Sequence, residues 1–413
     1  MTPAFSEMTR VFGRIGLLSF GGPAAQIALM HDALVARQKW LSEDQYLRAL
    51  SLCMLLPGPE AMQLATYAGW RLRGVAGGLL AGLLFVMPGA LIILCLALGY
   101  VQFGTLPLVQ AAFFGIKATV IVVVLQALLR LGQKALKRRA AWMLAGAAFV
   151  ALFVFGLPFP LIVVCAGLYG YFTADLNAAS PPLIPARTNT RATIAIWTSL
   201  WAAPLVVLWI TAQDFLLQLG FFFSKLAVVT FGGAYAVLAY MTQTVVQDFG
   251  WINTPQMIDA LGLAETTPGP LILVTEFVAL LAGFAHGGVW MALAAGAVAL
   301  WVTFTPCFLW IFVAGPYLDH IAARPRLSAA LSGIAAAVVG VILNLSVWFA
   351  LHVFFGSISS VQGLAIPVPQ YATLNLWAVV LTLVAGVLML CMKVGFLPTL
   401  ALMAALGGVT FLL

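Results

Sequence analysis

The stretch Ser19-Phe20-Gly21-Gly22 returns 211 residues later as Thr230-Phe231-Gly232-Gly233. At the same spacing, Pro57-Gly58-Pro59 returns as Pro268-Gly269-Pro270. Glycine and proline interrupt helices, so each motif marks a break between two helical segments. Breaks at matching positions in two halves of an apolar chain are typical of secondary transporters, which build their binding sites from interrupted helices.

Composition places this duplicated chain in a membrane. Of its 413 residues, 63% are hydrophobic and 8% are charged, with a mean hydropathy of +1.09. Soluble domains carry about 25% charged residues, so we predict an all-α polytopic membrane protein. The five cysteines lie in apolar segments without metal or redox spacing, and the sequence therefore predicts no metal site and no cofactor. The net charge of +7 does not indicate a nucleic-acid partner, because much of it gathers in one loop at 130–139.

The duplication divides the chain into three parts. We expect a first repeat over 1–174, a linker with a single connecting transmembrane helix over 175–212, and a second repeat over 213–413. Residues 12–59 align with 223–270 without a gap, and 16 of these 48 positions are identical. Each repeat contains an even number of crossings and one helix separates them. The second repeat is therefore predicted to insert upside down, as an inverted-topology repeat.

Charge in the loops supports this orientation. The loop at 130–139 is strongly basic, whereas its counterpart at 356–372 contains no lysine or arginine. By the positive-inside rule, the N-terminus is predicted to be cytoplasmic and the C-terminus periplasmic. The motif segments are either broken helices that cross the membrane or re-entrant hairpins. We favour hairpins, because each motif lies midway between two short helical stretches.

The motifs are predicted to form the substrate site. The two glycines allow a tight reversal, and the proline that follows suits the first turn of a helix whose free N–H groups bind anions. The alternative is that glycine and proline only kink ordinary helices; the duplication of both motifs at one spacing favours a functional site. The expected substrate-binding residues are Arg14, Ser19, Gly21, Gly22, Pro23, Pro57, Gly58, Pro59, Lys225, Thr230, Gly232, Gly233, Thr266, Thr267, Pro268, Gly269 and Pro270.

Charged residues inside apolar segments are costly and are candidates for function. Arg14 and Lys225 are repeat counterparts, and two such cations would neutralise a divalent oxyanion; the alternative is that each extends to the membrane surface. The candidates for proton coupling are Glu60, Glu265, Glu276 and Lys117. Glu60 equally suits a helix N-terminus, where a carboxylate stabilises the helix dipole. Lys117 is expected to pair with one of the glutamates.

Three glycines spaced four apart, Gly74, Gly78 and Gly82, predict a closely packed helix face. The sequence shows no nucleotide-binding loop, nucleophile elbow or zinc motif. We therefore expect a transporter that uses ion gradients and is not an enzyme.

The runs from Phe20 to His31 and from Leu55 to Ala61 resemble the chromate ion transporter family, and so do 230–236 with 263–270. The resemblance covers essentially the full chain and is similar to the long, two-domain bacterial form. It implies a multi-pass protein of the bacterial inner membrane that exports chromate and confers chromate resistance, with sulfate as the competitor. The second repeat departs from the first at two positions, with Ala234 in place of Pro23 and Leu271 in place of Glu60.

Several alternatives stay open from the residues alone. Sulfate or another oxyanion is an alternative substrate, and an anion channel would use the same site without alternation. A membrane enzyme that reduces chromate is a further alternative, although the sequence has no redox site. Apart from the oxyanion and the lipid bilayer no partner is predicted, and a homodimer is one oligomeric state that the sequence leaves open.

Overall fold

The computed structural model describes residues 3–20, 22–174, 190–231, 234–317, 324–360 and 365–412. Helices make up nearly all of these residues, which confirms the predicted all-α fold. A small antiparallel pair of strands, β1 (Ile358–Ser360) and β2 (Pro367–Pro369), is the exception. The predicted site residues Gly21, Gly232 and Gly233 lie outside the described residues.

Five stretches of the described chain are long and apolar enough to cross a membrane. They are α4 (Glu60–Phe103), α5 (Pro107–Ala135), α8 (Thr190–Ile210), a stretch from Leu271 to Tyr317 that contains α12 (Val274–Ala314), and α14 (Pro325–Phe354). Four shorter apolar helices are α6 (Arg139–Phe153), α7 (Phe159–Phe172), α15 (Leu376–Gly386) and α16 (Phe396–Leu412). At 1.5 Å per residue the short helices fall below the roughly 20 residues that a spanning helix needs. They occur in two consecutive pairs, α6 with α7 and α15 with α16.

The motif segments form shorter helices. In the first repeat these are α1 (Phe5–Leu18), α2 (Gly22–His31) with the π-helical turn η1 (Asp32–Arg37), and α3 (Glu43–Leu55). In the second repeat they are α9 (Asp214–Val229), α10 (Ala234–Thr242) with η2 (Gln243–Asp248), α11 (Thr254–Thr266) and the short turn η3 (Leu271–Leu273). Every motif therefore separates two helices, as glycine and proline require.

The two repeats fold alike in detail. Both π-helical turns, η1 and η2, occur at positions related by 211 residues. A reciprocal capping box starts α3, between Ser42 and Gln45, and another starts α11, between Asn253 and Gln256. Because capping and helix geometry follow local sequence, the duplication is visible at the level of single hydrogen bonds.

The helices gather into two compact units, and each unit takes segments from both repeats. The first unit contains Met1–Ala97, Thr173–Val237 and Thr267–Ser328; the second contains Leu98–Phe172, Leu238–Thr266 and Ala329–Leu413. The hairpin α2–α3 belongs to the first unit, whereas most of the equivalent hairpin α10–α11 belongs to the second. Sequence repeats and compact units are therefore different divisions of this chain.

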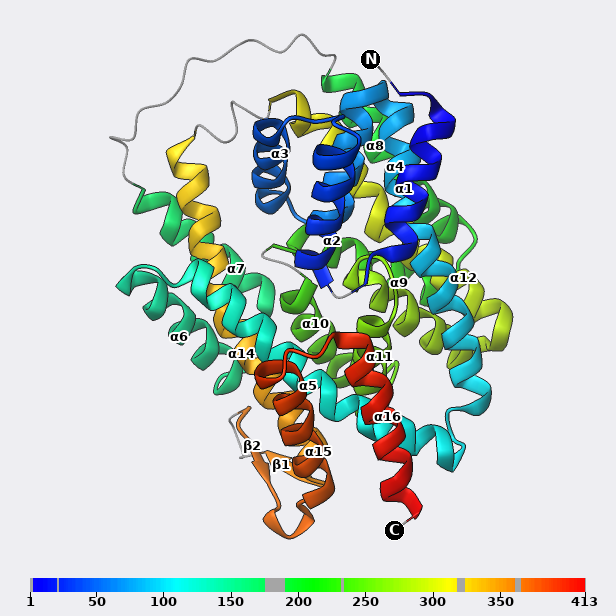
Figure 1. Cartoon of the computed structure of the whole chain (residues 1–413), viewed down its shortest axis with the longest axis vertical. Helices are drawn as coiled ribbons and strands as arrows, with labels where there is room; N and C mark the ends of the chain where they lie inside the picture. The colour runs from blue at the N-terminus through cyan, green and yellow to red at the C-terminus, as the bar shows by residue number, and fades with distance from the viewer. Residues whose placement is uncertain are drawn as a thin grey trace. The chain divides into compact units, whose positions relative to one another are not determined.

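Within the first unit, the motif helices turn back on themselves. The rings of Phe12 in α1 and Trp40 beyond η1 lie 6.2 Å apart, which a straight helix broken at residues 19–22 would not allow. Tyr46 of α3 donates a hydrogen bond of 2.6 Å to the carbonyl of Ile27 in α2, and Figure 1 shows these two helices side by side. The arrangement is that of hairpins rather than of straight broken helices.

The long helix α4 also reverses. Arg73 and Gly74 leave the helical conformation, with a φ of +62° at Gly74, and a β-carbon at Gly69 would overlap the carbonyl of Gly77. α12 reverses in the same way at Gly287 and Gly288. Gly74 therefore forms a helix corner, which corrects its predicted place on a packing face. Gly78 and Gly82 do pack closely, against the rings of two phenylalanines of α12, Phe312 and Phe308.

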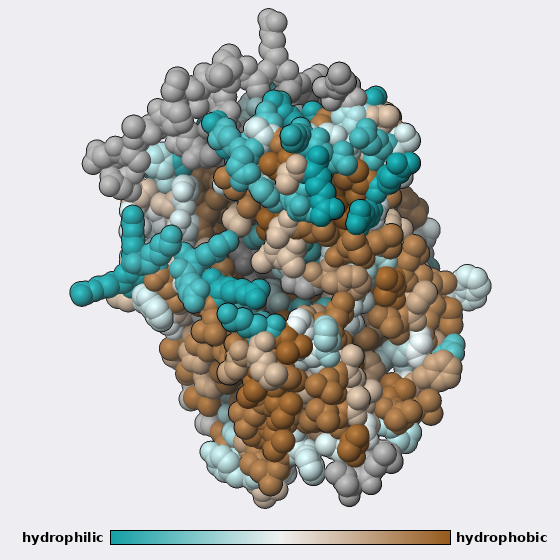
Figure 2. Space-filling view, in the orientation of Figure 1, coloured by the Kyte–Doolittle hydropathy of each residue, from teal (hydrophilic) through white to brown (hydrophobic). Residues whose placement is uncertain are grey.

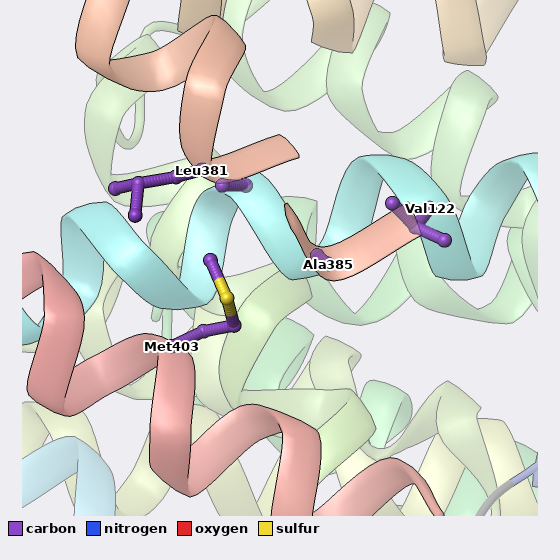
Figure 3. Packing of buried hydrophobic residues seen from close by; sticks show 5 residues of the cluster. Val122, Leu381, Ala385 and Met403 are labelled. Carbon is purple, nitrogen blue, oxygen red and sulfur yellow. The ribbon is translucent and has the colours of Figure 1, made fainter. Parts of the chain in front are cut away.

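In the second unit, α5 packs against the final two helices of the chain. Leu381 and Ala385 of α15 and Met403 of α16 lie along α5 in one cluster with Val122 (Figure 3), and all four side chains are buried.

Exposed apolar side chains are abundant, among them Trp209, Trp290 and Phe172, and Figure 2 shows hydrophobic residues over large parts of the visible face. A surface of this kind is stable in lipid and not in water.

Candidate functional site

The four motifs meet inside the first unit through two reciprocal hydrogen bonds. Gly58 N–H donates to the carbonyl of Thr230 at 2.8 Å, and Gly269 N–H donates to the carbonyl of Ser19 at 2.9 Å. Gly269 is the repeat counterpart of Gly58, and Ser19 is the repeat counterpart of Thr230. The two hydrogen bonds are therefore equivalent. Two repeats related by a twofold axis produce such a pair, so the motifs of one repeat are closed by the motifs of the other.

Ser19 and Thr230 present their carbonyls at the ends of α1 and α9. The Ser19 hydroxyl donates to the carbonyl of Ile15 at 2.6 Å, and the Thr230 hydroxyl donates to the carbonyl of Leu226 at 2.5 Å. Both side chains are buried. Their hydroxyls thus bond to the preceding turn of helix, which leaves the main-chain carbonyls for the crossing.

The crossing depends on glycine for conformation and space. Gly58 has a φ of +119° and Gly269 a φ of +91°, values that side chains disfavour. A β-carbon at Gly58 would lie 2.8 Å from Nε2 of Gln63 and 3.0 Å from Sγ of Cys307. Pro57, Pro59, Pro268 and Pro270, which flank the two glycines, are all buried.

Two buried glutamines complete the crossing, and the sequence analysis did not identify them. Nε2 of Gln26 donates to the carbonyls of Gly269 at 2.7 Å and Ser19 at 3.1 Å, so one amide joins both motifs. Nε2 of Gln63 donates to the carbonyl of Pro57 at 2.6 Å. A polar residue in an apolar segment is the signal that could have found them. The repeat comparison hid Gln26, because its counterpart in the second repeat is Val237.

The second half of each long helix passes over a motif of the opposite repeat. A β-carbon at Gly89 of α4 would overlap the carbonyl of Pro268, while Cys307 of α12 lies against Gly58. Each of these contacts follows a proline inside the helix, Pro88 and Pro306. Such a proline frees a carbonyl one turn earlier, and Trp201 of α8 donates its indole N–H to that carbonyl of Val302 at 3.1 Å.

Helix N-termini lie next to the crossing. α2 begins at Gly22, followed by Pro23, and α4 begins at Glu60. The first N–H groups of a helix have no intrahelical acceptor, and Gln63 N–H closes the first turn of α4 on Pro59. The N–H groups of Gly58 and Gly269 are already bonded to protein carbonyls. This corrects the expectation that these two N–H groups face the anion. The donors that remain for an anion are the N–H groups of the residues that follow them in the chain.

Both copies of the duplication match a known protein family. The sequence pattern of the chromate transporter family matches residues 6–171 and 217–410, which are the two copies of the duplication. This chain belongs to the chromate transporter family. The resemblance that the motifs predicted is thereby confirmed.

Relatives of the transporter span most of its length. A chromate transport protein of Pseudomonas aeruginosa is 34% identical over 346 residues, which cover 82% of this chain and 79% of the relative. A probable chromate transport protein of Synechococcus elongatus is 32% identical over 347 residues, or 82% of this chain and 84% of the relative. A chromate transport protein of Cupriavidus metallidurans is 29% identical over 351 residues, or 83% of this chain and 81% of the relative. No solved structure matches the chain.

The predicted cations of this transporter have exposed side chains. Arg14 lies on the exposed side of α1, and Lys225 lies at the equivalent position of α9. Thr267 is buried beside the second Pro-Gly-Pro motif, whereas the hydroxyl of Thr266 bonds to the carbonyl of Leu263 in its own helix. Thr266 belongs to the second unit, and Thr267 to the first.

The three candidate glutamates have different surroundings. Glu60 is half-buried at the first position of α4, and Glu265 is buried in α11 of the second unit. Glu276 is buried in the first turn of α12, where its Oε2 contacts no hydrogen-bond partner among the described residues. The positive end of the helix dipole favours a carboxylate at such a position.

Lys117 differs from its predicted environment. Its Nζ lies 2.9 Å from Oδ1 of Asp259, so its partner is an aspartate and not one of the glutamates. Asp259 is buried in the middle of α11.

Proposed function

We propose that this chain is a secondary transporter that exports chromate from the bacterial cytoplasm and thereby confers chromate resistance. Membership of the chromate transporter family supports the substrate. The observation that carries the mechanism is the reciprocal crossing of Gly58 with Thr230 and of Gly269 with Ser19. Helix N-termini gathered at a repeat interface are the usual substrate site of secondary transporters.

The proposed site binds a tetrahedral dianion mainly through backbone N–H groups. The N-terminal turns of α2, α4 and α10 and the turn η3 before α12 would supply these donors, from the non-proline residues at 22–24, 59–61, 234–235 and 270–272, together with positions 21, 232 and 233 outside the described residues. Partial positive charge at each N-terminus favours the anion, and Arg14 and Lys225 would balance its charge. Chromate and sulfate have the same charge and shape, so we expect sulfate to compete.

The proposed orientation in the inner membrane follows the basic residues. Arg71 and Arg73 lie at the corner of α4, and the side chain of Arg73 donates to the carbonyl of Pro3 at 2.7 Å. The N-terminus and this helix corner therefore share one face. The positive-inside rule assigns that face to the cytoplasm, together with the basic connection between α5 and α6. The C-terminus is then periplasmic, and the second repeat is inverted.

Alternating access requires two groups of helices that move relative to each other. The division of this chain into two compact units, each with segments of both repeats, provides such groups. An anion channel would need no such division. We therefore favour a transporter over a channel.

The test is chromate uptake by proteoliposomes that contain the full chain in a uniform orientation. Uptake that is stimulated by chromate inside the vesicles, driven by an imposed pH gradient and blocked by excess sulfate would support an exporter. Flux that only equilibrates would indicate a channel, and sulfate flux without chromate flux would indicate a different substrate.

The proposed cations provide a sharper test of the site. Arg14→Ala and Lys225→Ala should each abolish transport while the protein remains folded, because each removes a charge that balances the dianion. Arg10→Ala, which removes an exposed arginine one turn earlier on α1, is the matched control and should leave transport unchanged. Full transport by both Arg14→Ala and Lys225→Ala would contradict their role.

A further inference from the structure

The second unit contains a buried ion pair that belongs to no repeated motif. Nζ of Lys117 in α5 lies 2.9 Å from Oδ1 of Asp259 in α11. The hydroxyl of Tyr100, near the end of α4, donates to Oδ2 of Asp259 at 2.7 Å. The side chain of Asp259 is 7% exposed and that of Lys117 is 21% exposed. Burial of charges in an apolar contact between helices costs desolvation free energy, so such charges are candidates for a function.

The ion pair is specific to one place in the duplicated chain. At the same positions of the other repeat, Asp259 corresponds to Arg48 and Lys117 to Ala335. Arg48 forms an exposed pair with Asp44 of its own helix. The fold of a repeat therefore does not require a carboxylate at the position of Asp259. A general packing role does not explain it.

One side of the ion pair opens onto a cavity. The cavity has a volume of about 350 Å³, and Lys117 lines it together with Thr254, Ile258, His352 and Ser357. Nδ1 of His352 lies 2.8 Å from the carbonyl of Trp348, so this nitrogen carries the proton and Nε2 is the basic one. A cavity of this size has room for water beside Lys117.

Contact between α5 and α11 is close at this point. A β-carbon at Gly262 of α11, one turn beyond Asp259, would lie 2.8 Å from Cγ2 of Ile116, the neighbour of Lys117. Among the described residues, Nζ of Lys117 is the one polar partner of Oδ1 of Asp259. Protonation of the carboxylate would remove the attraction that holds Lys117, and Lys117 would then extend into the cavity. The charge state of Asp259 is thereby linked to the packing of the α10–α11 hairpin against α5.

We propose that Asp259, held by Lys117 and Tyr100, is the proton-binding carboxylate that couples transport to the pH gradient. This inference rests on the proposed function. The carboxylate binds one proton in one state of the transporter and releases it in the other. Charged and titratable groups near Asp259 are Lys117 on α5, Tyr100 at the end of α4, Glu265 on α11 itself, and His352 of α14 across the cavity.

The test separates exchange from coupling in proteoliposomes that contain the full chain. Exchange of labelled for unlabelled chromate needs only substrate binding and alternation, whereas net accumulation also needs the proton. Asp259→Asn should retain exchange within about twofold but lose at least tenfold of the accumulation driven by a pH gradient. Asp248→Asn is the matched control, because Asp248 is an exposed aspartate of the same hairpin, and it should behave like the parent chain.

The outcomes distinguish the two proposals. Absence of exchange in the parent chain would overturn the proposed function itself. Normal gradient-driven accumulation by Asp259→Asn would overturn only the coupling role. If Asp259→Asn does not fold, the double variant Lys117→Gln with Asp259→Asn leaves no buried charge unpaired and should show exchange without coupling. Loss of exchange in a folded double variant would overturn the coupling role, because the ion pair would then be required for anion binding or for alternation.

Tyr100→Phe gives an independent measurement. The hydroxyl of Tyr100 stabilises the ionised carboxylate, so its removal should let Asp259 bind a proton at higher pH. The midpoint of the pH profile of gradient-driven transport should rise by about half a unit to one unit, with exchange unchanged. An unchanged midpoint would contradict the assignment, because a purely structural tyrosine has no reason to move it.

Discussion

The hairpins α2–α3 and α10–α11 arise from the same repeated sequence, yet they have different surroundings. Around α2 and α3 the charged residues pair on the surface: His31 with Glu43, Asp32 with Arg37, and Asp44 with Arg48. In α11 the residues from 257 to 265 are all buried, and Asp259 pairs with Lys117 of another helix. The two hairpins thus share the motif crossing and the helix caps. They differ in between, where α2–α3 carries charged surface pairs and α11 is buried.

With the coupling role that we propose for Asp259, this difference would let a symmetric site serve an asymmetric process. The crossing needs both copies, because each motif is closed by the carbonyl of the other. Coupling needs only one titratable group, and a second copy would add a second desolvation penalty. The two hairpins therefore differ in their buried charge, which costs free energy, and are alike in the backbone geometry that the crossing requires.

Exchange of the two charges between the hairpins should have the largest and most unequal effects. Asp259→Arg introduces the residue of the first repeat and places two cations together at a buried site, which should cost about 3–5 kcal/mol of stability. The reverse change, Arg48→Asp, affects an exposed pair and should cost no more than about 1 kcal/mol. Thermal unfolding in detergent would measure both. Equal costs would show that the two hairpins are not different after all.

Glycine substitutions at the crossing should affect both copies in the same direction. Gly58→Ala and Gly269→Ala force a β-carbon into a positive φ, which should cost about 1–3 kcal/mol each and abolish transport. The cost at Gly58 should be larger, because its φ is more extreme and its neighbours are closer.

A matched control lies in the adjacent helix. Gly13 of α1 has no atom within 4 Å of a β-carbon position, so Gly13→Ala should instead stabilise the helix by about 0.5–1 kcal/mol. Thermal unfolding and chromate exchange would be measured for all three variants. Normal transport by Gly58→Ala would refute the requirement for glycine at the crossing.

Helix caps should give the smallest and most equal effects. Ser42→Ala and Asn253→Ala each remove one half of a capping box that both repeats share. Each change should cost about 0.5–2 kcal/mol, and the two costs should agree within about 0.5 kcal/mol. Thermal unfolding of both variants would test this, and a clear difference would show that the surroundings of the hairpins reach as far as their caps.

The class of protein, the duplication and the positions of the helix breaks could all be predicted from the order of the amino acids. These properties are local, since apolar composition selects the membrane and glycine with proline ends a helix wherever they stand. The sequence therefore predicted the motifs and the family. It also predicted Ser19, Gly58, Thr230 and Gly269 as site residues, which meet at the crossing.

Which groups contact each other depends on the three-dimensional packing of the helices. Gly58 and Thr230 are far apart in the chain, and no local pattern could show that an N–H expected to face the anion is bonded to that carbonyl. Gln26 and Asp259 were missed for the same reason, because the value of a buried polar group depends on its partners. Long-range contacts also define compact units that contain segments of both repeats. Packing depends on which helix surfaces fit together, whether or not the helices belong to the same repeat.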